Sequence, residues 1–392
     1  MGIRASMTVF TNPKALSRQY IPARLPHREP QLSMLQSIFS DVRAGLPYFK
    51  VVQLIGPKGT GKTTSTHLLL RYLSSASPGS VAHVYLNLRA LSEPSPWVIY
   101  SQLITRVGGR PSRNLSAGEL FEKFVSLLQR DANRTYVVTV DEAEQLTGYR
   151  SIHGGQIVYN LTRLPEFGVE NVSGVIFISR EEDWASHLAP EERSSLGALI
   201  VRYPAYTRDQ LVDILLFRSG EAFVPGALSG AIIEYLAEVT EAVFESDLRR
   251  ALDVLLLAGQ IADSEKAGKV SIEHLNKAIA QSLRERYLFS HSVDQLGTAE
   301  KVVLLAVLLA SRQLNQSFVA MRDVYKQVAL VCENYGMKSL SQREQEEALQ
   351  RLADEGYIQF RGPLKIYVTA FPSTMDPSML AERLLGARRQ RA

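Results

Sequence analysis

The segment from Val51 to Leu70 constrains the fold more than any other part of the chain. It reads VVQLI, GPKGTGKTT, STHLLL: a mostly apolar run, a loop that fits G-x-x-x-x-G-K-[ST], and the start of an apolar-faced helix. In that context the glycines let backbone N–H groups turn toward a phosphate chain, and the helix N-terminus adds the positive end of its dipole. The candidate phosphate-binding residues are Gly56, Pro57, Lys58, Gly59, Thr60, Gly61, Lys62, Thr63 and Thr64.

Lys62 and Thr63 carry the chemistry expected of such a loop, since the lysine would reach the β- and γ-phosphates and the hydroxyl would be a ligand of Mg²⁺. A second apolar strand, residues 135–140, leads into Asp141 and Glu142. Asp141 would hold Mg²⁺, directly or through water, and Glu142 would polarise the attacking water. Because apolar strands ending in Asp-Glu are common, this interpretation depends on the phosphate loop upstream.

The pattern along the chain predicts three parts. Apolar strands alternate with helical segments up to about residue 205, which predicts an α/β core with a parallel sheet and a ligand at the carboxyl ends of its strands. From Thr207 onward, consecutive amphipathic helices predict a helical domain. From about residue 291, three helices followed by a two-stranded hairpin predict a winged helix. Residues 1–30, with prolines and mixed charges, predict a surface segment without regular structure.

Composition limits the cellular compartment and the kinds of partner that the chain can have. The net charge of +4 permits nucleic-acid binding but does not require it. The single cysteine, Cys332, rules out a disulfide within the chain and a multi-cysteine zinc site, and fits a reducing cytosol. The N-terminus lacks the apolar run of a signal peptide, and the longest apolar run, Val302 to Ala310, is too short to cross a bilayer. We therefore expect a cytoplasmic protein without a membrane partner.

Together these motifs resemble those of the archaeal origin-recognition-complex type (Orc/Cdc) DNA replication initiators, which are AAA+ ATPases with a helical lid and a C-terminal winged helix. The resemblance covers nearly the whole chain. It includes both nucleotide motifs and the segments YIPARLPHRE, YPAYTRDQLVDILLFR and SDLRRALDVL. It implies an AAA+ α/β domain over residues 1–205 (with the N-terminal segment 1–30), a lid over 206–290 and a winged-helix domain over 291–392.

The resemblance also implies an ATP or ADP site shared between core and lid. An aromatic residue at the hinge offers adenine a flat apolar surface. An arginine from the lid gives charge-assisted hydrogen bonds that depend on the γ-phosphate, so lid position reports ATP or ADP. The residues that fall at nucleotide-contacting positions of the family are Tyr20, Ile21, Pro22, Tyr206, Arg218 and Arg249, the last at the sensor 2 arginine.

Two positions depart from the family pattern. Arg180, in the sequence ISRE, stands where the sensor 1 strand is normally followed by asparagine, and an arginine cannot position a water as an amide does. Glu191 stands where the family often has an arginine, the nearest cation being Arg193. Both changes favour slow hydrolysis and ATP as a structural switch. We take Glu142, Arg180 and Arg249 as the candidate catalytic residues.

For DNA, the resemblance implies contacts from the third helix and wing of the winged helix and from an insertion within residues 97–125 of the ATPase domain. Arginine and glutamine suit guanine and adenine edges, although arginine also binds phosphate without reading sequence. The candidate DNA-binding residues are Arg106, Arg110, Arg113, Gln342, Arg343, Gln345, Arg361 and Lys365.

The implied function is initiation at double-stranded origin DNA, with ATP or ADP as the switch and recruitment of the replicative helicase. Other copies of the initiator are implied as possible further partners. Two alternatives remain at this stage. One is a regulatory AAA+ ATPase with a DNA-binding tail, a transcription regulator or transposition helper. The other is a nucleotide-binding scaffold whose winged helix binds protein.

Overall fold

The computed structural model describes residues 8–75, 79–91, 94–147, 154–289, 296–313, 318–354, 357–360 and 365–368. The chain divides into two compact units, Met1–Ile272 and Glu273–Ala392. Over the ranges just given, no helix has the length and apolar character needed to cross a membrane.

The first unit is built around a five-stranded parallel sheet, which confirms the predicted α/β core. The register pairs Ile55 with Ser179 and Asp141 with Ile178, so the ends of β1, β4 and β3 meet at one edge. Sequence patterns missed the edge strand β5, which has only three residues. The strand order is β2 (Val81–Asn87), β3 (Thr135–Asp141), β4 (Val172–Ser179), β1 (Lys50–Ile55) and β5 (Ile200–Arg202).

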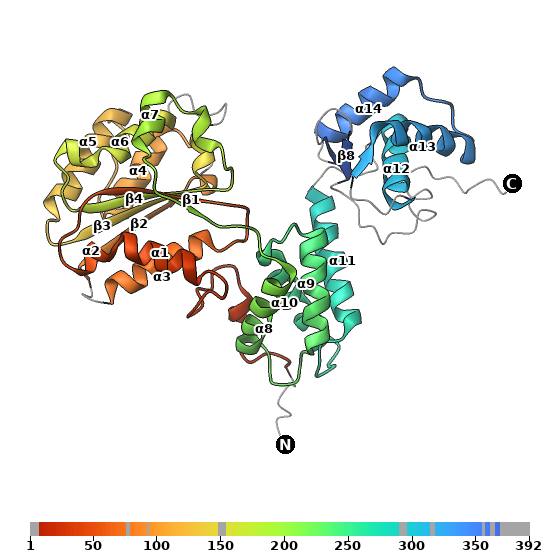
Figure 1. Ribbon diagram of the computed structural model, residues 1–392, viewed down its shortest axis with the longest axis horizontal. Coiled ribbons are helices and arrows are strands. Elements are labelled where there is room, and N and C mark those ends of the chain that lie inside the picture. Colours follow the sequence, from red (N-terminus) through yellow and green to blue (C-terminus); the bar gives the residue numbers. More distant parts are fainter. Residues whose placement is uncertain are drawn as a thin grey trace. The chain divides into compact units, whose positions relative to one another are not determined.

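Helices cover both faces of this sheet (Figure 1). One face carries α1 (Glu29–Ile38) and α3 (Lys62–Ser74), whose Leu35 and Leu69 are fully buried with Leu54 of β1. After α1 the backbone leaves helical geometry at Phe39, before the short helix α2 (Ser40–Arg43). The other face carries α4 (Pro96–Arg106), α5 (Ala117–Arg130), α6 (Gly154–Thr162) and α7 (Pro190–Ser195).

The helical part of the first unit is α8 (Arg208–Ala222), α9 (Gly230–Val243) and α10 (Leu248–Ser264). Thr207 caps α8 through a capping box with Gln210. The N-terminal segment differs from its prediction: Pro13–Leu16 forms a short 3-10 helix with fully buried Ala15 and Leu16, packed on α8 and α10. Its apolar side chains gain more by burial in the helices than by lying exposed on the surface.

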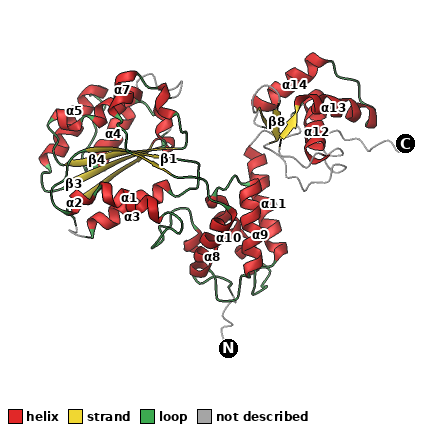
Figure 2. Ribbon diagram, viewed as in Figure 1, coloured by secondary structure: helices red, strands yellow, loops and turns green. Residues whose placement is uncertain are grey.

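The second unit contains the predicted winged helix (Figure 2). Its core includes Val303, Val328 and Leu349, one from each of three helices. The predicted hairpin is extended to three antiparallel strands in the order β6-β8-β7, because residues 318–320 add a strand too short to stand out in sequence. The elements are α11 (Ile272–Phe289), α12 (Thr298–Gln313), β6 (Phe318–Ala320), α13 (Met321–Asn334), α14 (Gln342–Asp354), β7 (Ile358–Phe360) and β8 (Lys365–Val368).

Candidate nucleotide site and nucleic-acid interface

The phosphate loop joins β1 to α3 and is closely confined by its surroundings. Gly59 has a φ of +75°, and a Cβ added there would lie 2.2 Å from Asp247 Oδ1 at the start of α10. A side chain at Gly56 would come within 2.0 Å of the Tyr203 carbonyl oxygen. These glycines are therefore required both by backbone conformation and by the close approach of the hinge and the lid helix.

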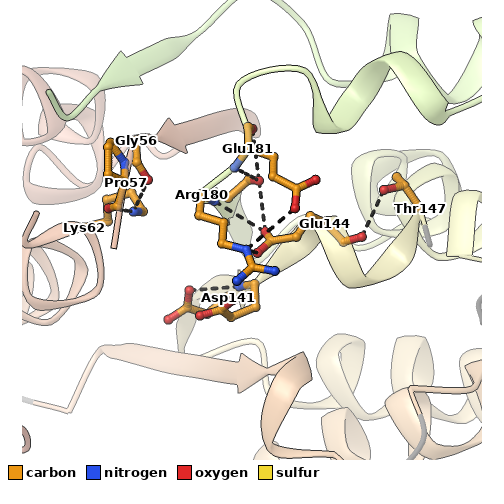
Figure 3. A network of polar contacts seen from close by, with 10 residues as sticks. Gly56, Pro57, Lys62, Asp141, Glu144, Thr147, Arg180 and Glu181 are labelled. Atoms are coloured by element: carbon orange, nitrogen blue, oxygen red, sulfur yellow. Dashed lines mark hydrogen bonds and ion pairs between the residues drawn. The ribbon is translucent and has the colours of Figure 1, made fainter. Parts of the chain in front are cut away.

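Lys62 lies at the first position of α3, with its ammonium group turned back over the loop. It donates to the carbonyl oxygens of Gly56 and of Pro57, the latter at 2.7 Å (Figure 3). Burial, and then the nearby charge of Arg249, lower the pKa of Lys62 to about 8. The lysine of the loop and the lid arginine therefore face the same region, although α3 and α10 are far apart in sequence.

A second cation lies in the same region. Burial lowers the pKa of Lys58, and the charges of Arg180 and Arg89 lower it further. Repulsion among positive groups from the phosphate loop, β4 and the end of β2 makes this part of the molecule suited to a polyanion. Sequence reasoning did not single out Arg89, which is exposed on the 3-10 turn Leu88–Ala90 that follows β2.

Thr63 and Asp141 come together as their motifs predict. The Thr63 hydroxyl donates to Asp141 Oδ2 at 2.7 Å, joining the start of α3 to the end of β3. A second hydroxyl, that of Tyr85 on β2, donates to the same carboxylate oxygen at 2.7 Å. Sequence reasoning missed Tyr85, because its place beside Asp141 depends on the pairing of β2 with β3.

Glu142 follows Asp141 in a left-handed conformation, with a φ of +59°. Burial raises the pKa of its carboxyl group, and the neighbouring carboxylates of Glu144 and Asp141 raise it further. Its Oε2 is buried and accepts no hydrogen bond from the residues that the structure describes. An unsatisfied buried acceptor next to the phosphate loop is suited to a water or another ligand.

Arg180, at the predicted sensor 1 position, forms an ion pair with Glu144 at 2.9 Å between Nε and Oε1 (Figure 3). The Glu144 side chain is only 2% exposed and also accepts a hydrogen bond from the Ser179 hydroxyl at 2.9 Å. A buried carboxylate needs such partners. The arginine that replaces the family's asparagine thus serves as the counter-ion of a glutamate that sequence reasoning did not select.

Tyr206, the aromatic residue at the hinge between core and lid, does not have both faces of its ring free. Tyr206 is 3% exposed, and the guanidinium carbon of Arg28 lies 3.8 Å from its ring centroid, so one ring face is already covered. Arg28 Nε and the Tyr206 hydroxyl both donate to the Thr60 carbonyl oxygen, at 2.8 Å and 3.1 Å. Arg28, which the sequence patterns did not reveal, therefore ties the N-terminal segment and the hinge to the phosphate loop.

Arg218 is bonded to the N-terminal segment. It is 6% exposed, donates to the Ala15 carbonyl oxygen at 2.9 Å from Nε, and lies 5.1 Å from the Tyr20 ring centroid. Ile21 and Pro22 follow in the same segment, with Pro22 buried. Arg218 thus contacts the N-terminal segment at Ala15 and at Tyr20.

The candidate residues on α14 are exposed or partly buried and bond locally. The Arg343 side chain is 88% exposed and pairs with Glu347 at 2.9 Å; Gln342 donates to Glu346 at 2.9 Å. Gln345 donates to the Leu340 carbonyl oxygen at 2.9 Å. Over its length α14 carries two arginines against four acidic residues, which is an unfavourable charge for a helix beside phosphates.

The remaining candidates are spread over two units. Arg106, near the end of α4, donates to the Tyr85 carbonyl oxygen at 2.7 Å, whereas Arg110 and Arg113 are exposed in the following loop. Lys365 is the first residue of β8. Arg361 lies outside the described residues.

Comparisons with known proteins agree with this architecture. Three family models match in chain order: an AAA ATPase domain over 24–172, a Cdc6 AAA+ ATPase-type lid domain over 212–280 and a CDC6 C-terminal winged-helix domain over 291–363. Among solved structures, that of the Aeropyrum pernix ORC1 protein in complex with DNA is 28% identical, has a TM-score of 0.68 and covers 97% of each chain.

Curated relatives extend the agreement over most of the chain. The ORC1-type DNA replication protein 1 of Sulfurisphaera tokodaii is 31% identical over 90% of this chain and 86% of its own. That of Aeropyrum pernix is 33% identical over 77% of this chain and 75% of its own. This agreement favours a replication initiator over a transcription regulator or transposition helper. The chain belongs to the family of ORC1-type DNA replication proteins.

Proposed function

We propose that this initiator binds ATP or ADP with Mg²⁺ in the core, uses the nucleotide as a conformational switch, and binds double-stranded origin DNA. The observation that carries the nucleotide part is the convergence of Lys62 with Thr63, Asp141 and the lid arginine Arg249 at one sheet edge. The residues implied by the family, Tyr20, Ile21 and Pro22, would border the base.

Mg²⁺ fits the residues present. The Thr63 hydroxyl and the Asp141 carboxylate are hard oxygen donors whose oxygens lie 2.7 Å apart, and Mg²⁺ prefers few protein oxygens together with phosphates and water. Thr63 and Asp141 would hold the ion, which neutralises phosphate charge when bound. Lys62 would exchange its bonds to loop carbonyls for bonds to phosphate.

The lid supplies the switch in this proposal. The start of α10 lies against Gly59, and Arg249 is in its first turn, so a γ-phosphate would bond to a residue of the lid helix. ADP offers no such partner, which leaves the lid less firmly held. Slow hydrolysis is the expectation from Arg180, which is engaged with Glu144 and cannot position a water as an amide does.

DNA binding would involve the winged helix, through Gln342, Arg343, Gln345, Arg361 and Lys365, and the loop after α4, through Arg106, Arg110 and Arg113. The related Aeropyrum protein was solved in complex with DNA, which supports this part of the proposal. Recruitment of the replicative helicase and contacts between initiator copies complete it. The proposed domain limits are those of the sequence, 1–205, 206–290 and 291–392. We place the protein at the nucleoid in the cytoplasm.

The test is the affinity of the purified protein for duplex DNA over a series of salt concentrations, with Mg²⁺–ATP and with Mg²⁺–ADP. We expect the logarithm of the affinity for DNA to fall linearly with the logarithm of the salt concentration, since each neutralised phosphate releases counter-ions. We also expect the affinity with Mg²⁺–ATP to differ from that with Mg²⁺–ADP. Binding without salt dependence, or none, would favour a winged helix that binds protein. Rapid hydrolysis without preference for any DNA would favour a regulatory ATPase.

A further inference from the structure

Tyr85 stands beside the candidate Mg²⁺ site without being one of its ligands. We propose that Tyr85 is a positioning residue that holds the Asp141 carboxylate in the orientation needed for the Mg²⁺–nucleotide complex. The inference rests on the proposed function of the phosphate loop and adds to it a residue from β2. It follows from one hydrogen bond and from the way in which the tyrosine ring is fixed.

The hydrogen bonds around Asp141 leave its carboxylate little freedom. Its Oδ2 accepts from two hydroxyls, those of Thr63 and Tyr85, each at 2.7 Å. Its Oδ1 accepts from the backbone N–H of Glu142 at 2.9 Å. Of the two hydroxyls, only that of Thr63 belongs to the phosphate-loop motif. Tyr85 is thus the donor that can stay on Asp141 when Thr63 turns its oxygen toward an ion.

The Tyr85 ring is held by neighbours on two elements. Its centroid lies 5.3 Å from that of His67 on α3 and 5.8 Å from that of His83, two residues earlier on β2. His83 is itself anchored, because its Nε2 lies 2.9 Å from the Thr139 hydroxyl on β3. At the backbone, the Tyr85 carbonyl oxygen accepts from Arg106 at 2.7 Å.

A donor held by such packing acts as a support for the ligand rather than as a ligand. A phenol is a neutral donor at pH 7, so it can bond to a carboxylate that keeps its charge for the ion. Hydrogen bonds from the surroundings fix the orientation of metal-binding side chains, and their removal typically weakens metal affinity by roughly 10- to 100-fold. The expected effect of losing the Tyr85 hydroxyl is therefore on the Mg²⁺-dependent part of nucleotide affinity alone.

The experiment is a calorimetric titration of ADP into the full chain, once with excess Mg²⁺ and once with EDTA. The wild type should bind ADP more tightly with Mg²⁺. Tyr85→Phe should lose roughly 10- to 100-fold of affinity with Mg²⁺ and show unchanged affinity in EDTA. The Mg²⁺ concentration that produces half of the gain in ADP affinity should be higher for Tyr85→Phe than for the wild type.

Tyr136→Phe is the matched control. Tyr136 is on the neighbouring strand β3 and also donates to an aspartate, Asp131 Oδ2, at 2.7 Å. Its loss should leave both ADP affinities at wild-type values, while the melting temperatures of the two variants show what each hydroxyl contributes to folding. If Tyr85→Phe does not fold, 4-fluorophenylalanine at position 85 keeps the side-chain volume without a donor and should give the same loss.

Three results are decisive. Wild-type affinity of Tyr85→Phe under both conditions would overturn the inference. So would an equal loss with Mg²⁺ and in EDTA, because Tyr85 would then shape the pocket without acting on the ion site. Absence of ADP binding by the wild type would instead overturn the proposed nucleotide function, on which the inference depends.

Discussion

Lys62 is selected from the phosphate-loop motif and Arg343 from the resemblance to a winged helix, and the structure surrounds these two cations differently. Lys62 is buried, and elements distant in sequence converge on it, including the lid helix. Arg343 is 88% exposed and bonds to Glu347 one turn along its own helix. A network across elements restricts what a site can bind, whereas a local pair on a helix surface stabilises the helix and restricts little else.

Physical chemistry therefore supports the two halves of the function unequally. At the phosphate loop, several positive groups repel one another, which is unfavourable unless an anion binds there, and the oxygens of Thr63 and Asp141 lie together beside them. On α14 the acidic residues outnumber the arginines. The proposal that the winged helix binds DNA therefore rests on family membership more than on the charge of its third helix.

The largest expected effect is that of Lys62→Ala. We expect ADP affinity to fall by at least roughly 100-fold, because a charge-assisted bond to phosphate in a buried site contributes about 3 kcal/mol. Calorimetric titration measures it, with the melting temperature as a check of folding. Undiminished affinity would show that the phosphate loop does not bind the nucleotide, and the contrast between Lys62 and Arg343 would then no longer hold.

Next in size is the loss of the counter-ion of Glu144. Arg180→Ala should lower the free energy of unfolding by about 2 kcal/mol, because it leaves the buried carboxylate of Glu144 without its counter-ion. The effect is smaller than for a fully buried pair, because solvent screens the arginine side chain, which is 30% exposed. Arg202→Ala is the control: its pair with Glu182 is exposed, with side chains 63% and 74% exposed, and should contribute about 0.5 kcal/mol or less. Denaturant unfolding measures both; equal effects would show that the Glu144 pair is only a surface pair.

A smaller effect is expected for Arg343→Ala. Duplex DNA affinity should fall by about 1 kcal/mol, the low end for a base-reading arginine, because binding must first replace the pair with Glu347. Arg322→Ala, an exposed arginine on α13, is the control and should change affinity less. Fluorescence anisotropy with a set of duplexes measures both. A preference among sequences that does not change in Arg343→Ala would exclude Arg343 from base reading.

The smallest effect concerns the turn that brings the lid to the phosphate loop. Glu245 and Ser246 have φ values of +55° and +58°, in the left-handed region that favours glycine. Ser246→Gly should raise the free energy of unfolding by about 0.5 kcal/mol. Glycine relieves the backbone strain at this position, and the greater freedom of the unfolded glycine chain offsets part of that gain. Ser264→Gly, at the end of α10, should lower it. A lower stability of Ser246→Gly in thermal unfolding would contradict the strain.

Sequence patterns predicted the parallel core, the lid helices and the winged helix, because their apolar periods are long and the phosphate-loop motif places its strand and helix. Arg28, Tyr85 and Glu144 escaped prediction because their partners are set by strand order and by segments distant in sequence. Gly259 illustrates the limit: a Cβ there would lie 2.2 Å from the Phe10 ring. Nothing in the local sequence of α10 indicates that the N-terminal segment packs against it.

The most direct test of the account is a nuclease footprint of the full protein on a library of its own genomic DNA, with Mg²⁺–ATP and with Mg²⁺–ADP. We expect a discrete protected repeat beside a replication start, with protection that differs between the two nucleotides. Protection at scattered promoters, or the same weak protection everywhere, would contradict the proposal that this chain recognises an origin.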